Sequence, residues 1–272
     1  MPSDPSGIVK TFLAAGTLPL SRSVSKVQSM LSHSDYNAAD LAEQLRMDPT
    51  LATRVMAVAN SAFFSRQPCD AIDDAVNRLG TIQLTRIFAQ VLANAALMSP
   101  LQAYGLSADD IRRRSIFTAV GAEMAAGRQG ADRSAAYMVG LLHEVGMLVV
   151  DSLWSKQGGP QKLAYADFSL EYSAAEKSLC GFDQAALSAE LLKQLSFPES
   201  VYQVIGRQYR TPLEPLACAL YVGRLARSFA CDSLKPDPNQ DVLHSYRITS
   251  TSQLDAFLSD VREEAQNRMK GG

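Results

Sequence analysis

Residues 140–147 read Gly-Leu-Leu-His-Glu-Val-Gly-Met and set an imidazole beside a carboxylate, at His143 and Glu144. Imidazole nitrogens and carboxylate oxygens are ligands that proteins use for divalent metals, and a catalytic metal typically takes about three ligands from the protein. The other two histidines of the chain are His33 and His244. His143 and Glu144 are therefore the residues from which any metal-dependent chemistry in this chain would have to start.

A run of three arginines, residues 112–114, offers a second kind of chemistry. Arginine binds phosphate through paired hydrogen bonds, so the run could form an anion pocket for a nucleotide or a phosphate group. Three consecutive residues of a helix, however, fan over about 200° and cannot share one face. We expect a solvated helix surface with one arginine turned inward, and the anion pocket is the alternative.

The composition is that of a globular chain without a nucleic-acid or membrane partner. Of its 272 residues, 47% are hydrophobic and 20% are charged, and the net charge is −2. Nonspecific binding to nucleic acid or anionic lipid needs clustered lysine and arginine. No apolar run approaches the roughly 18 residues that span a bilayer. The first residues lack a basic stretch followed by an apolar one, so we expect no signal peptide.

The four cysteines are widely spaced, and none belongs to a Cys-x-x-Cys pair. A disulfide framework or a zinc site would need closer, paired spacing. We therefore expect free thiols, buried or half-buried, in a reducing cytoplasm. The cysteines are Cys69, Cys180, Cys218 and Cys231.

The elements that must position these residues are predicted to be almost entirely helical, because apolar residues recur at helical spacing and alternating strand patterns are scarce. Asp48 before Pro49 marks a helix start, Gly80 marks a helix end, and Ser107 with Asp110 fits a capping box. After shorter helices near the N-terminus, the expected helices cover residues 48–60, 71–79, 81–98, 108–127, 132–143, 145–154, 169–180, 184–195, 198–209, 214–230 and 251–268. Because of its prolines, the stretch 234–245 is expected to be an irregular connection.

Several short motifs of the N-terminal half occur in an order that resembles the HDOD family of bacterial signalling domains. They are Leu18-Pro19, the helix start Asp-Pro-Thr-Leu at 48–51, the segment Ala-Asn-Ser-Ala-Phe-Phe at 59–64, and Ile72, Ala75, Leu79 and Gly80 in the pattern Ile-x-x-Ala-x-x-x-Leu-Gly. The resemblance covers roughly residues 18–215. It implies an all-α, multi-helical, two-lobed HDOD fold whose second lobe resembles a degenerate HD hydrolase.

The resemblance also implies a domain division. The expected parts are an N-terminal arm at 1–17, an HDOD domain at 18–215 with an N-terminal helical lobe at 18–100 and an HD-like lobe at 107–215, and a C-terminal helical extension at 216–272. The joint between the lobes is expected at residues 100–105. The last helix, 251–268, is amphipathic, so it either packs on its own domain or docks on a partner.

In HD hydrolases the segment that contains His143 reads His-Asp, usually followed by Gly-Lys, whereas here Glu144 and Met147 stand in place of Asp and Lys. Arg114 stands where an upstream metal-binding His is common in the family, and a guanidinium has no lone pair to offer a metal. Asp183 remains as a further acid downstream. We expect no catalytic residue, no metal and no cofactor.

The resemblance thus marks a vestigial active-site pocket with potential ligand contacts. Its residues are Arg113, Arg114, His143, Glu144 and Asp183. His143 lies among apolar neighbours, so we expect it to be buried and hydrogen-bonded. Our hypothesis is that Glu144 pairs with an arginine of the 112–114 run, so that a salt bridge replaces the metal.

Three functions are then open. The preferred one is a non-catalytic regulatory module that acts through a protein partner, tuned by a small ligand in the former cleft. The alternatives are a residual metal-dependent phosphohydrolase that uses His143, Glu144 and Asp183, and a nucleotide sensor without hydrolysis, in which residues 112–114 bind a small phosphorylated ligand. DNA binding by the helix-turn-helix-like stretch 41–55 is not expected, because its second helix is apolar where a recognition helix is polar.

Overall fold

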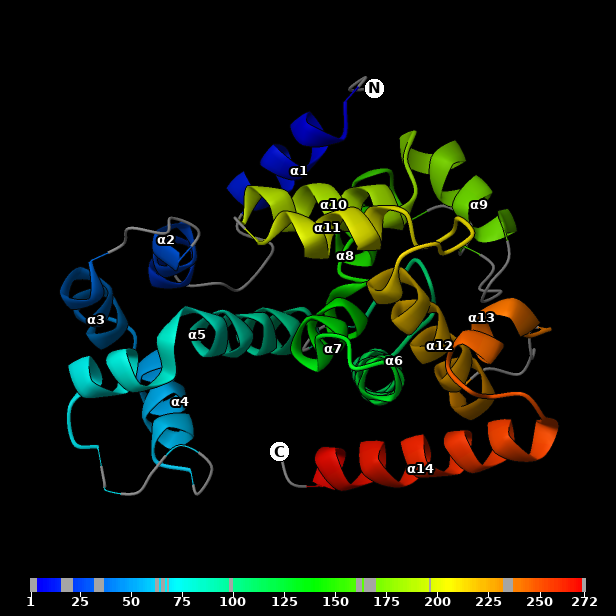
Figure 1. The fold of residues 1–272 in the computed structure, drawn as a ribbon. Helices are drawn as coiled ribbons and strands as arrows, with labels where there is room; N and C mark the ends of the chain where they lie inside the picture. The colour runs from blue at the N-terminus through cyan, green and yellow to red at the C-terminus, as the bar shows by residue number, and fades with distance from the viewer. Residues whose placement is uncertain are drawn as a thin grey trace.

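The computed structural model describes residues 4–15, 22–31, 37–61, 64, 67, 69–97, 100–159, 163, 170–195, 197–231 and 237–270. Within these ranges the protein is helical apart from one antiparallel bridge between Leu101 and Leu106, which confirms the expected fold class (Figure 1). The helices are α1 (Pro5–Ala14), α2 (Arg22–Leu31), α3 (Ala38–Arg46), α4 (Pro49–Ala59), α5 (Ile72–Leu97), α6 (Ala108–Arg128), α7 (Arg133–Leu142), α8 (Met147–Lys156), α9 (Leu170–Cys180), α10 (Gln184–Gln194), α11 (Glu199–Gly206), α12 (Pro215–Cys231), α13 (Gln240–Ser245) and α14 (Thr251–Lys270).

Helices α2 to α5 form the first lobe around a hydrophobic core that includes Leu41, Leu51 and Val55. The side chain of Asp48 accepts a hydrogen bond from the Leu51 amide at 3.1 Å, so the expected cap of α4 is confirmed. Leu51 and Val55 are fully buried, so one face of α4 lies in the core of this lobe, as the sequence predicted, while Thr53 and Arg54 are exposed on the other side. Within α5, Gly80 has a φ of 66° and separates two helical halves, as the sequence predicted.

Some motifs of the first half fall outside the described residues. These are Leu18-Pro19, His33, and Ala62 and Phe63 of the 59–64 segment. The described part of that segment behaves as a helix stop, because the Asn60 side chain exchanges hydrogen bonds with the backbone of Cys69 at 2.7 and 2.9 Å.

The second lobe is built on α6, with α7 and α12 packed closely against it. Glycines permit this approach: a Cβ on Gly140 would lie 2.6 Å from the Cα of Ala119, and a Cβ on Gly223 would lie 2.3 Å from the Thr118 carbonyl. The capping box of Ser107 and Asp110 starts α6 as predicted. The backbones of α7 and α12 therefore hold their side chains against the same part of α6.

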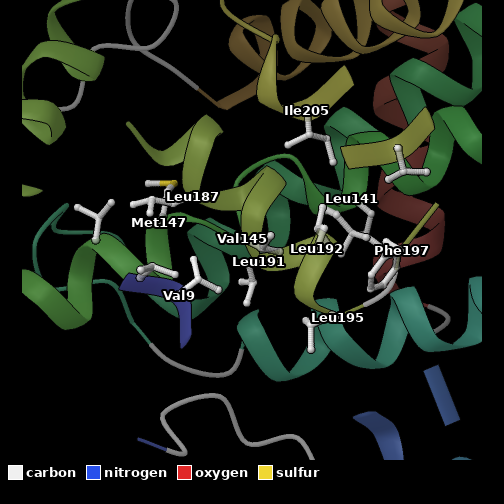
Figure 2. Close-up of a cluster of buried hydrophobic side chains, with 14 of the residues drawn as sticks. Val9, Leu141, Val145, Met147, Leu187, Leu191, Leu192, Leu195, Phe197 and Ile205 are labelled. Carbon is white, nitrogen blue, oxygen red and sulfur yellow. The ribbon is translucent and has the colours of Figure 1, made fainter. Parts of the chain in front are cut away.

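Helix α1 packs on the second lobe. Val9 is fully buried against α8 and α10, and Figure 2 shows it beside Met147, Leu187 and Leu191 in the same apolar cluster. The segment expected to be an arm thus contributes to the core of the lobe that carries the candidate site.

The C-terminal stretch contradicts the prediction for residues 240–245 and shows where the last helix packs. Residues 240–245 form helix α13, capped by Asn239, so the expectation of an irregular connection there was wrong; a short Asn-capped turn of helix follows the prolines. Helix α14 packs across α6, which Figure 1 shows nearly end-on, and buries Phe257 and Val261. Its apolar face is therefore covered by its own domain.

One stretch, Arg133–Lys156, is long and apolar enough to cross a membrane by length and composition. Of its apolar window, 67% is buried inside the protein, because α7 and α8 belong to the core of the second lobe. No other described stretch passes the same test.

Candidate functional site

Three elements bring the candidate residues together. Arg114 lies on α6, His143 and Glu144 lie at the turn between α7 and α8, and Arg227 lies on α12. His143 follows the last residue of α7 as its C-cap, just beyond the helix that was expected to carry it. The turn rests on α10, because a Cβ on Gly146 would lie 2.1 Å from the Gln184 carbonyl oxygen and only glycine fits.

Glu144 is the centre of a buried ion cluster. Its Oε1 lies 3.2 Å from Nη2 of Arg114 and is also contacted by Nη1 of Arg227. The exposed fractions of the three side chains are 9% for Glu144, 4% for Arg114 and 0% for Arg227. The hypothesis that Glu144 pairs with an arginine of the 112–114 run is confirmed, and the structure adds a second arginine.

His143 is fully buried and turns both ring nitrogens toward the protein. Nδ1 lies 2.8 Å from the Gly140 carbonyl oxygen, which can only accept, so Nδ1 carries the proton. Nε2 then presents its lone pair 3.5 Å from Nη1 of Arg227. Burial lowers the pKa of His143 to about 3, so the ring is neutral at pH 7, and the expected buried, hydrogen-bonded histidine is confirmed.

Polar side chains from α10 and from the end of α11 hold the backbone of the α7–α8 turn. Ser188 Oγ accepts from the Gly146 amide at 2.7 Å, and Gln208 Nε2 donates to the His143 carbonyl at 2.8 Å. Arg224, a second arginine of α12, donates to the Gln208 carbonyl at 2.6 Å. These bonds fix the turn from behind and leave the Glu144 carboxylate facing the two guanidinium groups.

A second buried acid lies on α9. Glu176 is fully buried and accepts hydrogen bonds from the Tyr104 hydroxyl at 2.9 Å and from the Gln184 amide at 2.6 Å. Burial raises the pKa of Glu176 to about 8, and the charge of Glu144 contributes to the same shift. This acid is therefore mostly protonated at pH 7 and adds little negative charge to the cluster.

The other two residues of the expected pocket make their contacts elsewhere. Asp183 caps α10 through the Ala186 amide at 2.9 Å and lies 3.1 Å from Lys177 Nζ. Arg113 is exposed and donates to the Ala230 carbonyl at 3.0 Å. The structure thus brings together Arg114, His143 and Glu144, and holds Asp183 and Arg113 in structural contacts of their own.

The donors at this centre do not fit a divalent metal. His143 Nε2 and Glu144 Oε1 are 3.7 Å apart, but two permanently charged guanidinium groups lie against the same carboxylate. Within the described ranges, no three His, Cys, Asp or Glu side chains are close enough to hold a metal ion. A metal would have to displace both arginines and would still lack a third protein ligand among these residues.

Sequence reasoning missed Arg227 and Glu176. A signal for Arg227 exists in hindsight, since Arg224 and Arg227 lie three residues apart in a helix whose neighbours are otherwise apolar, and both are buried. Arginine on a buried helix face implies a buried acidic or carbonyl partner. The sequence, however, gives no reason to expect that Glu144 is the partner of Arg227.

Comparisons with known proteins agree with this fold. The family model of the HDOD domain matches residues 18–211. A structure of a protein from Marinobacter aquaeolei VT8, to which a signal transduction role is ascribed, has a TM-score of 0.65 and 20% identity, and covers 93% of this chain. The chain spans 58% of the length of that protein.

Two further structures match over nearly their full length. A protein from Shewanella amazonensis SB2B, to which metal-dependent phosphohydrolase activity is ascribed, has a TM-score of 0.57 and 21% identity, over 96% of this chain and 98% of its own. An HDOD domain protein of unknown function from Geobacter sulfurreducens has a TM-score of 0.57 and 20% identity, over 96% of both chains. Among curated proteins, none matches the chain.

Proposed function

The chain is a member of the HDOD family, and from that premise we propose that it is a non-catalytic regulatory module of bacterial signalling. The observation that carries the proposal is the ion cluster, in which Arg114 and Arg227 both contact Glu144 where an HD hydrolase would bind its metal. The signal transduction role ascribed to the Marinobacter protein also supports a signalling role for this chain.

The physical reason is electrostatic. Guanidinium groups remain protonated at any physiological pH, so the positive charge that pairs with Glu144 cannot be released to make room for a metal. Arg114 and Arg227 are buried with the carboxylate, where charges interact more strongly than in water. The residual phosphohydrolase would need this cluster to open, and a nucleotide sensor would need its phosphate to compete with Glu144 for the same arginines.

The module is proposed to act through a protein partner in the cytoplasm. With its former pocket closed by the ion cluster, its output would depend on the surface it presents to other proteins. The cysteines support a reducing compartment, because Cys69, Cys180, Cys218 and Cys231 are all free thiols in the structure.

The test is elemental analysis of the purified full-length protein after incubation with manganese, iron or zinc, together with hydrolysis of bis(p-nitrophenyl) phosphate. We expect substoichiometric metal and no hydrolysis above buffer. The matched control is His143→Ala, which removes the buried histidine next to Glu144. Stoichiometric metal that is lost in His143→Ala, with hydrolysis lost in parallel, would contradict the proposal and restore the hydrolase.

A further inference from the structure

Two adjoining cavities form one groove on the surface of the second lobe. The first, of about 560 Å³, lies between α7, α11 and the loop before α12. The second, of about 450 Å³, continues from it to the seam with the first lobe, where α5 and α2 form its far wall. Asp132, Ala135 and Ser200 line both cavities, so the two lie side by side on this surface. Cavities at the seam between two lobes are common binding sites.

The groove is mainly apolar, and each of its two cavities is lined by an exposed hydrophobic side chain. Val204 and Leu216 line one cavity, and Met138 and Val201 line the other. Leu213, in the first cavity, is 89% exposed, and Ile82, in the second, is 70% exposed. Together with the apolar lining, these two exposed side chains form a hydrophobic surface that offers anchor points to another chain.

Arginines line the same groove and have no acidic partner among the described residues. Arg207 caps the end of α11, Arg210 follows it in the loop, and Arg86 lies on α5. The one side-chain bond that the structure gives these three arginines joins Arg86 Nη1 to Gln83 Oε1 at 3.1 Å. Arg207 and Arg210 are exposed, so their charges are available to a ligand.

The acids of the groove all lie at helix N-termini, where amide groups and the helix dipole offset a negative charge. Asp132 caps α7 and accepts hydrogen bonds from the Ser134 and Ala135 amides at 2.8 and 3.1 Å. Glu199 is in the first turn of α11, and Glu214 immediately precedes α12. The arginines are thus the charged groups of this surface that remain to be paired.

We propose that this groove is the partner-docking surface, and that its occupant is an acidic segment of another protein with apolar side chains. The apolar side chains would cover Leu213 and Ile82, and the acidic ones would pair with Arg207, Arg210 and Arg86. The inference rests on the proposed function as a protein-binding module and names the surface and the chemistry of the partner. Apolar anchors give such a complex its affinity, and the arginines select an acidic partner.

The experiment is a selection of random 12-residue displayed peptides on the intact protein, followed by fluorescence anisotropy with the recovered peptides. We expect sequences that combine Asp or Glu with Leu, Phe or Trp. Arg207→Glu/Arg210→Glu should weaken their binding about tenfold or more, because it places like charges together. Leu213→Asp should weaken it by a similar factor, because it removes an anchor.

The matched controls change the same charges and the same kind of side chain away from the groove. Lys10→Glu/Arg262→Glu makes the same net charge change on exposed positions of α1 and α14, and Met47→Asp replaces a methionine that is 72% exposed on the first lobe. These controls should bind the peptides as the unaltered protein does.

Three outcomes would overturn the proposed groove: no peptide enriched over the Arg207→Glu/Arg210→Glu variant, recovered peptides without acidic bias, or equal weakening by the controls. Gel filtration gives a fourth outcome that would overturn it. If the unaltered protein is a dimer and Leu213→Asp is a monomer, the groove binds a second copy of this chain. None of these outcomes depends on the metal analysis. The peptide experiments can therefore contradict the docking groove without contradicting the proposal of a non-catalytic module, and the metal analysis can contradict that proposal without contradicting the groove.

Discussion

The two lobes treat their buried polar groups differently. In the described part of the first lobe, the buried polar side chains are Asp48 and Thr85, and each bonds the backbone within four residues of itself. In the second lobe, Arg114 and Arg227 meet Glu144 across 30 and 83 residues of sequence. The first lobe pairs these buried polar groups with nearby backbone of its own chain, whereas the second buries charges that only its tertiary structure can pair.

This difference between the lobes indicates where the molecule buries polar groups for reasons other than stability. A buried ion cluster is costly to assemble and is seldom the most stable way to fill a core. The cluster lies between α6, α12 and the α7–α8 turn, where the resemblance to HD hydrolases would place a metal centre, and it supports our proposal that the second lobe is a former active site. Among the first-lobe residues whose side chains are described, no arginine or lysine is buried.

The largest expected effect is at the centre of the cluster. Glu144→Ala leaves Arg114 and Arg227 buried without their shared carboxylate, which should lower the free energy of unfolding by about 3–5 kcal/mol. The measurement is urea denaturation at pH 7. Glu263→Ala, an exposed acid on α14, is the control and should change stability by less than about 0.5 kcal/mol.

A triple variant sharpens this prediction. Arg114→Met/Glu144→Met/Arg227→Met replaces all three charges by apolar groups of similar length and should recover much of the loss, because buried ion clusters are often no better than apolar packing. If Glu144→Ala unfolds at the same urea concentration as the unaltered protein, the cluster does not stabilise the second lobe and the contrast between the lobes disappears.

The next effect is a pH dependence that arises from the second lobe. The folded pKa of Glu176 is about 8, above the ordinary value of 4.5, so its contribution to stability is complete below pH 4.5 and is lost as the pH rises through 8. The folded pKa of His143 is about 3, below the ordinary 6.5, so its contribution is present above pH 6.5 and is lost as the pH falls through 3.

The two contributions oppose each other between about pH 4.5 and 6.5, and Glu176 alone acts between about pH 6.5 and 8. Stability should therefore fall across that upper window with a slope on the order of 1 kcal/mol per pH unit. Thermal denaturation at closely spaced pH values checks this. Glu176→Gln should flatten the slope, and an unchanged slope in that variant would assign the pH dependence to other groups.

Most of the fold could be predicted because its signals are local. The cap at Asp48, the capping box at Ser107 and the stop at Gly80 each depend on residues within a few positions of one another. The family motifs are likewise short and ordered along the chain. The wrong expectation at residues 240–245 came from taking the prolines to exclude a helix up to Ser245, although Asn239 caps a short helix directly after Pro238.

The candidate site was only partly predictable, because its contacts are set by tertiary structure. Spacing along the chain marked His143, Glu144 and Arg114, but it gave no reason to choose Arg227, which lies beyond the family match. The helical turn that buries Arg227 faces Glu144 only because Gly223 lets α12 approach α6. Asp183 was marked by the same spacing argument, yet the structure uses it as a helix cap.

The smallest expected change in stability is for a variant of the first lobe, and it allows the two lobes to be compared directly. Asp48→Ala removes the side-chain cap of α4 and should lower the free energy of unfolding by about 1 kcal/mol. Asp48→Asn, which can still accept the Leu51 amide, is the control and should retain most of the stability. Urea denaturation of both variants beside Glu144→Ala measures the contrast directly. A loss for Asp48→Ala as large as that for Glu144→Ala would mean that a local cap and a long-range ion cluster matter equally, and the second lobe would no longer stand apart.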